Sequence, residues 1–257
     1  MSAPLDTLGK LAGLPDAELS RQVDVGSGKP PIQLVLYDLL RHEQALVAGA
    51  QPAGRTEVER ILDLAQVAYG ELVGVLVGRA DERLDSTRDG EWSLRDVLRH
   101  AIAVELRYGA QVEYSALRRD EEPMGIPNKR LPCDRLAPPE PQYADTRTAG
   151  FARILELLGV ARATTDNRLA SITDAALTRA SLWGTQPMTV RMRLHQVAAH
   201  LTECVIQSEK CLAAEPASEA RRILGRICAA RGAHERWSLA EARADLDERY
   251  RRLAAAC

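Results

Sequence analysis

One uninterrupted apolar stripe, between Met188 and Leu212, most limits what this chain can fold into. Apolar or small side chains recur there at alternating spacings of four and three residues, which is typical of a helix packed inside a bundle. Thr189 can cap the start of this helix, and no Gly or Pro interrupts it. The stripe is formed by Val190, Leu194, Val197, Leu201, Cys204, Ser208 and Cys211. We therefore predict a long, largely buried helix here.

Other segments repeat the same helical period, and none shows a convincing period of two residues. Three pairs of residues have the spacing of a capping box, in which a hydroxyl and a carboxylate satisfy backbone N–H groups reciprocally: Thr56–Glu59, Ser93–Asp96 and Ser238–Glu241. The remaining helices are expected at about residues 32–48, 56–77, 93–117, 146–172, 216–231 and 238–254. A short turn is expected at 182–187. The sequence therefore predicts an all-α fold.

Two local features of the helical segments need an interpretation. Gly70, Gly74 and Gly78 recur every fourth residue, although an interior Gly costs a helix about 1 kcal/mol. A role in close helix packing is the favoured explanation. His42 and Glu43 lie next to each other in the helix at 32–48, where no spacing to a partner supports a site. We interpret them as a surface pair.

Residues 119–144 differ in composition from the rest of the chain. They hold six of the thirteen prolines, so no long helix can form there. A connection of about 25 residues is longer than an ordinary loop. In a four-helix bundle, such a crossover allows two successive helices to run parallel.

Composition argues against several classes of protein. The formal net charge of −2 leaves no broad basic surface for nucleic acid. No apolar run reaches the length that spans a membrane. The cysteines are odd in number and form no Cys-x-x-Cys pair, which favours free thiols in a reducing cytoplasm. They are Cys133, Cys204, Cys211, Cys228 and Cys257.

Two histidines lie beside the apolar stripes of two different helices. His200 and Cys204 are four residues apart and therefore project from one side of their helix, whereas His195 falls about 140° away from His200. His100 occupies a similar position in the helix at 93–117. The three side chains could converge on a metal ion, or Cys204 could be a small buried residue beside two hydrogen-bonded histidines. Spacing alone leaves both interpretations open.

The motifs Trp92-Ser93-x-x-Asp-x-x-x-His100 and His200-x-x-x-Cys204-x-x-Gln207 resemble those of the DinB/YfiT-like superfamily. The resemblance covers about residues 55–213. It implies an all-α, up-down-down-up four-helix bundle at 55–213, with an N-terminal helical extension at 1–54 packed on it and a C-terminal one at 214–257. It also implies a divalent metal ion held by three ligands, usually histidines.

Carried to this sequence, the resemblance assigns the metal to His100, His200 and Cys204, with Cys204 standing where the family usually has His. Zinc or nickel is the expected ion, and Glu203 is an alternative third ligand. The implied activity is that of a thiol-dependent S-transferase or isomerase, using a low-molecular-weight thiol on a small electrophile, in a homodimer. The alternative is a metal-free helical bundle with a structural or ligand-binding role.

Overall fold

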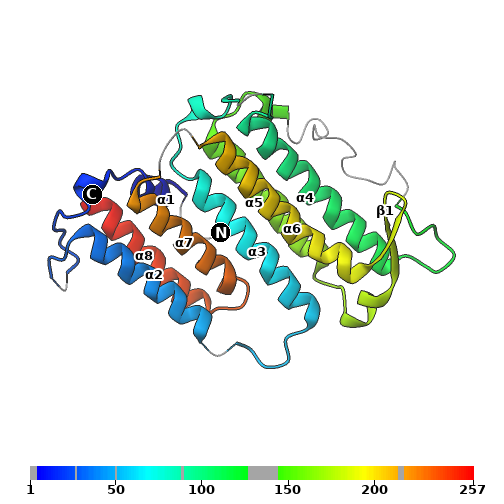
Figure 1. The fold of residues 1–257 in the computed structure, drawn as a ribbon. Helices are drawn as coiled ribbons and strands as arrows, with labels where there is room; N and C mark the ends of the chain where they lie inside the picture. The colour runs from blue at the N-terminus through cyan, green and yellow to red at the C-terminus, as the bar shows by residue number, and fades with distance from the viewer. Residues whose placement is uncertain (1–4, 27, 50, 88–89, 127–143, 214–216) are drawn as a thin grey trace.

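Long α-helices make up most of the molecule (Figure 1). The computed structural model describes every residue except 1–4, 27, 50, 88–89, 127–143 and 214–216. The α-helices are α1 (Leu5–Ala12), α2 (Ile32–Ala48), α3 (Glu57–Leu76), α4 (Leu94–Leu117), α5 (Phe151–Leu169), α6 (Val190–Cys211), α7 (Glu219–His234) and α8 (Ala240–Ala256). Short 3₁₀ helices lie at Asp16–Glu18, Asp81–Arg83, Ala144–Arg147 and Asp174–Thr178. Within these described ranges, no helix combines the length and the apolar character that crossing a membrane requires.

Helices α3, α4 and α6 establish the directions within a four-helix bundle. α3 and α6 begin at the same end, because Glu57 in the first turn of α3 pairs with Arg191 in the first turn of α6 at 2.6 Å. α4 runs the other way, since Ser115 near its C-terminal end lies 2.7 Å from Ser181, which precedes α6. α3 and α6 are therefore parallel, and α4 is antiparallel to α6.

Helix α5 completes the bundle and runs parallel to α4. Arg95, in the first turn of α4, donates a hydrogen bond of 2.6 Å to the carbonyl oxygen of Ala149, just before α5. The N–H of Phe151 is bound by Asp81, which follows the end of α3. The topology is thus up-down-down-up, and the predicted fold class is confirmed. Most of the Pro-rich connection at 119–144 lies outside the described residues.

The terminal helices form a second layer that shares α3 with the bundle (Figure 1). α7 packs along α3, α2 packs on α7, and α8 packs against α1 and α2. One hydrophobic core joins both layers, including Leu36 of α2, Leu72 of α3, Leu158 of α5 and Tyr250 of α8. α3 is consequently buried from two sides. The predicted division of the chain after residues 54 and 213 stays a prediction.

Glycines allow α3 and α7 to lie unusually close together. A Cβ atom on Gly70 would overlap the carbonyl oxygen of Cys228, and one on Gly74 would lie 2.7 Å from the Cα of Gly225. Gly78, just past the end of α3, has a φ of 69°, in the left-handed region that favours glycine. The predicted packing role of these glycines is confirmed.

The prediction that Glu43 lies at the surface is wrong. His42 stays partly exposed, but the side chain of Glu43 is fully buried where α2 meets α7 and α8. It accepts a hydrogen bond of 2.7 Å from the hydroxyl of Tyr250, forms an ion pair of 3.2 Å with Arg231, and contacts His234. The α2 sequence gave no sign of these partners because they come from the far end of the chain.

The segment before α6 is an antiparallel hairpin of strands β1 (Ala180–Trp183) and β2 (Gln186–Thr189) rather than a simple turn. Gly184, with a φ of 58°, lies in the connection between the strands. Thr189 ends β2 and also caps α6, because its side chain accepts a hydrogen bond from the Met192 N–H. The short turn predicted at 182–187 is therefore a hairpin instead, while the chain as a whole is mostly helical, in keeping with its all-α class.

The capping box predicted at Thr56–Glu59 is confirmed, and the one at Ser93–Asp96 is confirmed in part, because the Asp96 carboxylate accepts a hydrogen bond from the Ser93 hydroxyl and not from its backbone N–H. The hydroxyls of Thr56 and Ser93 accept backbone hydrogen bonds at the starts of α3 and α4. The third is wrong, because α8 begins after Leu239 with no side-chain cap. The Ser238 hydroxyl accepts a hydrogen bond from Arg243 instead. The Ser93 cap begins the first turns of α4, which lead to His100.

Candidate metal centre

A pocket of about 230 Å³ lies between α4 and α6 and brings together the residues that the sequence singled out. α4 contributes His100, less than two turns after its cap, and α6 contributes His200 and Cys204, one turn apart. Trp92, which precedes the α4 cap, lines the pocket as well. The remaining lining residues are Glu91, Val97, Glu203, Gln207, Lys210 and Cys211.

His200 contacts both His100 and Cys204. The ring centroids of His100 and His200 lie 4.9 Å apart, with an angle of 67° between the ring planes. The Cys204 sulfur lies 3.8 Å from Nε2 of His200. His200 and Cys204 are buried, and His195 does not line the pocket. Convergence of the two histidines, which spacing could not decide, is therefore found in the structure.

The present arrangement of the side chains is not that of a closed metal site. Within the part of the chain that the structure describes, no three His, Cys, Asp or Glu side chains form a group that could hold a metal ion. The His100 and His200 rings instead pack edge to face. A metal ion would therefore require rotation of these side chains within the pocket.

His100 carries a polar atom that the surrounding protein leaves unsatisfied. Its Nδ1 is buried and has no hydrogen-bond partner among the described residues. Leaving such an atom without a partner costs about 1–3 kcal/mol. The ring is held by edge-on contact with Trp92, at a centroid distance of 5.0 Å, and by the contact with His200. His100 therefore brings to the pocket wall a ring whose buried Nδ1 has no hydrogen-bond partner among the described residues.

Burial determines the protonation states in the pocket. It lowers the pKa of His100, an effect partly opposed by the carboxylate of Glu203. Burial, with the nearby His100, lowers the pKa of His200 to about 4. Both imidazoles are thus neutral at pH 7, the form that binds metals. Burial also raises the pKa of the Cys204 thiol to about 12, so a metal ion would have to displace its proton.

Sequence reasoning missed Tyr108, which packs on His200 behind the pocket lining, and it missed the contribution of Lys210 and Cys211 to the pocket itself. The Tyr108 ring lies 5.5 Å from the His200 ring, centroid to centroid, and comes from α4 two turns after His100. Lys210 lines the pocket, and so does Cys211, whose thiol donates to the carbonyl oxygen of Trp92 at 3.5 Å. Helical spacing from His100 and Cys204 could have indicated Tyr108 and Cys211. Glu203, considered as a ligand, is exposed but also lines the pocket.

The low pKa of His200 predicts a specific loss of stability in acid. The unfolded residue has a pKa near 6.5 and the folded one about 4, so between these values the unfolded chain binds more protons. The contribution of His200 to the free energy of unfolding of metal-free protein should therefore fall as the pH falls from 6.5 to 4, by about 1.4 kcal/mol per unit at most, and His100, whose pKa is also lowered, adds to this fall. Urea unfolding in the presence of a chelator measures this. His200→Gln should reduce the slope and His195→Gln should not; equal slopes in all three proteins would contradict the prediction.

A family model described as the DinB superfamily matches residues 4–203. No curated protein sequence matches the chain significantly. Among solved structures, the chain is similar to YfiT from Bacillus subtilis, described as a probable metal-dependent hydrolase with an unusual four-helix bundle topology. That similarity has a TM-score of 0.48 and 16% sequence identity, and covers 65% of this chain and 93% of YfiT.

Proposed function

This chain belongs to the DinB superfamily, and on that premise we propose that it is a metal-dependent enzyme acting on a small molecule. One observation carries the proposal: His100, His200 and Cys204 meet around one pocket in which a buried histidine nitrogen has no partner among the described residues. Neutral imidazoles and a thiol are donors suited to zinc or nickel. The donor chemistry therefore fits a divalent transition metal.

The pocket residues have separable roles in this proposal. His100, His200 and Cys204 would hold the ion, which when bound supplies a Lewis acid that lowers the pKa of a coordinated water or thiol. The exposed carboxylate of Glu203 lines the same pocket and can accept the proton released from the Cys204 thiol. Trp92 covers one edge of His100 and limits the access of water to it.

The volume of the pocket limits the size of a substrate that it could hold. At about 230 Å³ it lies below the usual range of about 300–1,000 Å³ for drug-sized ligands. The ammonium group of Lys210 and the carboxylate of Glu91 flank it, so both charge signs are available to a polar substrate. A small electrophile attacked by a low-molecular-weight thiol fits these limits. Thiol transfer or isomerisation remains our hypothesis for the reaction, and a homodimer remains a prediction from the family.

A metal-free helical module is the second candidate. The observation that favours it is the burial of Cys204, which is 2% exposed and whose pKa burial raises to about 12. A thiol in these surroundings behaves as a small apolar residue. In that case the pocket binds a small molecule without a metal or is purely structural.

Metal content separates the two candidates. We expect protein purified without a nickel column, then reconstituted with zinc, to hold about one equivalent. His100→Ala should lose most of it, and His195→Ala, outside the pocket, should not. The loaded protein should then add a small thiol to a chromogenic electrophile faster than His100→Ala does. A metal content below about a tenth of an equivalent in the reconstituted wild type would overturn the proposal.

Substitutions of Cys204 test its role directly. If it is a ligand, Cys204→His should retain or increase metal content and Cys204→Ala should reduce it strongly, because only two protein ligands remain. If Cys204 is only a core residue, alanine should be tolerated and histidine should cost about 1–3 kcal/mol by overpacking. Cys211→Ala, which removes another thiol from the same pocket, is the matched control. Equal metal content in wild type and Cys204→Ala would remove Cys204 from the site.

A further inference from the structure

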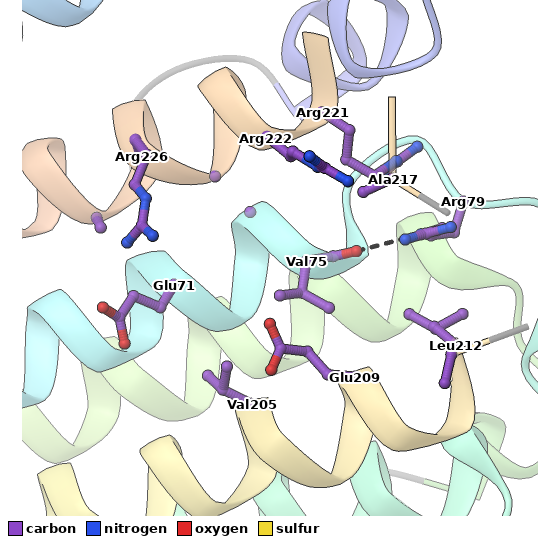
Figure 2. Close-up of a pocket in the computed structure, with 14 residues that line it drawn as sticks. Glu71, Val75, Arg79, Val205, Glu209, Leu212, Ala217, Arg221, Arg222 and Arg226 are labelled. Atoms are coloured by element: carbon purple, nitrogen blue, oxygen red, sulfur yellow. Dashed lines mark hydrogen bonds between the residues drawn. The ribbon is translucent and has the colours of Figure 1, made fainter. Parts of the chain in front are cut away.

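A second and larger pocket, of about 440 Å³, lies where α6 and α7 flank α3 (Figure 2). α3 and α7 approach closely at Gly74 and Gly225, and both glycines line the pocket, so no side chains fill it there. Val75, Val205 and Leu212 give it an apolar wall. α6 also carries His200 and Cys204, but these line the smaller pocket and not this one. The two pockets are therefore separate.

Charge in this pocket is strongly unbalanced. Four guanidinium groups and two carboxylates line it, which leaves an excess of two positive charges in a chain whose formal net charge is −2. Three of the arginines lie at one end in Figure 2, and Arg226 lies beyond them near Glu71. Glu209 projects from α6 between the two ends. The arginines at the first end are Arg79, Arg221 and Arg222.

Two of these arginines form hydrogen bonds that account for their positions in the fold. Arg79 donates to the carbonyl oxygen of Val75 at 3.3 Å, as drawn in Figure 2. Arg221 donates to the carbonyl oxygens of Val77 at 2.7 Å and Gly78 at 3.3 Å. These carbonyl groups belong to the C-terminal end of α3, where backbone acceptors lack helical partners and positive charge is favourable. Arg79 and Arg221 therefore stabilise the end of α3 while also making this end of the pocket positive.

No such hydrogen bonds account for the positions of Arg222 and Arg226 among the described residues. Both side chains are exposed, and neither guanidinium group forms a hydrogen bond or an ion pair with another described residue. They lie four residues apart on α7, and like charges at this spacing destabilise a helix by about 0.2–0.5 kcal/mol. An anion in the pocket would offset that repulsion and engage the donors of Arg222.

We infer that this pocket binds a small organic anion that carries one carboxylate or phosphate group on a short apolar body. The oxyanion would lie at the end formed by Arg79, Arg221 and Arg222, because guanidinium groups bind such groups through paired donors. The apolar body would lie against Val75 and Leu212. Glu209 makes a second anionic group on that body unfavourable. The volume is within the range of small-molecule sites.

Calorimetry on the full chain with three probes tests this inference. Sodium hexanoate and hexyl phosphate carry the two oxyanions on the same body, and 1-hexanol is the neutral analogue. We expect at least one anion to bind with a Kd of about 1 mM or tighter, and hexanol to show no binding. The tighter of the two anions identifies the group that the pocket recognises. No binding of either anion at about 10 mM, or equal binding of hexanol, would overturn the inference.

Variants of Arg222 test whether this arginine, which also lines a neighbouring pocket with Tyr37 and Glu219, takes part in anion binding. Arg222→Gln should weaken the anion about tenfold or more without lowering the Tm, since the side chain is exposed. Arg222→Lys keeps the charge and should recover part of the affinity. Arg252→Gln, on α8 and outside the pocket, removes the same charge and should bind as wild type does. If Arg222→Gln binds equally well, or if Arg252→Gln loses as much affinity, the assignment is wrong.

Discussion

Replacing Glu43 with alanine should lower the free energy of unfolding by about 3–5 kcal/mol. The carboxylate is fully buried and forms an ion pair with Arg231, which is 1% exposed. It also contacts His234 and accepts the hydroxyl hydrogen bond of Tyr250. Alanine would remove the buried carboxylate that offsets the charge of the Arg231 guanidinium group, and an incompletely compensated buried charge is costly even with Asp247 at 2.8 Å. Urea unfolding followed by circular dichroism measures the loss.

An exposed acid on α8 supplies the matched control. Glu248 pairs with Arg251 and Arg252 at the surface, and exposed ion pairs contribute about 0–1 kcal/mol. Glu248→Ala should therefore change the unfolding free energy little. A loss below 1 kcal/mol for Glu43→Ala would show that water or rearranged side chains replace the carboxylate. The cluster would then not hold α2 to α7 and α8.

Gly70→Ala should destabilise the protein by about 2 kcal/mol or more. The new methyl group would overlap the backbone carbonyl oxygen of Cys228, which cannot rotate away as a side chain can. α3 and α7 would have to separate, and packing along their shared seam would be lost. This cost outweighs the gain of about 1 kcal/mol that alanine gives over glycine in a helix.

Gly225→Ala is the control for this seam, because it makes the same chemical change on the facing helix. A Cβ atom on Gly225 would meet nothing within 4 Å. Only the higher helix propensity of alanine should then change the stability. This variant should therefore be as stable as wild type or more stable, by up to about 1 kcal/mol. The two substitutions are expected to have opposite signs in thermal or urea unfolding. If Gly70→Ala is also neutral, the helices are not held at the distance seen here.

Sequence periodicity predicted the helices well where a helix buries one stripe against the bundle. The segment from Val190 to Cys211 is the clearest case, because its apolar side chains and the Thr189 cap act within one helix. The family motifs also identified His100, His200 and Cys204, which the structure brings to one pocket. Local patterns suffice for features that depend on residues a few positions apart.

Features that depend on distant parts of the chain were not predictable in the same way. Glu43 has an ordinary surface context in its own helix, and only the arrival of Arg231 and Tyr250 explains its burial. Tyr108 packs on His200, although the motifs do not include it. The β1–β2 hairpin is too short to give a period-two signal. In each case tertiary contacts decided what local sequence left open.

The second layer joins the N-terminal helix α2 to the C-terminal helices α7 and α8, and this arrangement affects the order of folding. The partners of Glu43 lie 188 to 207 residues further along the chain. At a synthesis rate of about 5–20 residues per second, α2 leaves the ribosome about 10–40 s before α7 and α8. Its apolar face, with Leu36 and Leu39, lacks the cover of α7 and α8 during that time. The four bundle helices, whose partners emerge sooner, can pair first. Packing of α2, α7 and α8 onto the bundle is then the last step of folding, and it is the step before which apolar surface stays exposed and prone to aggregation.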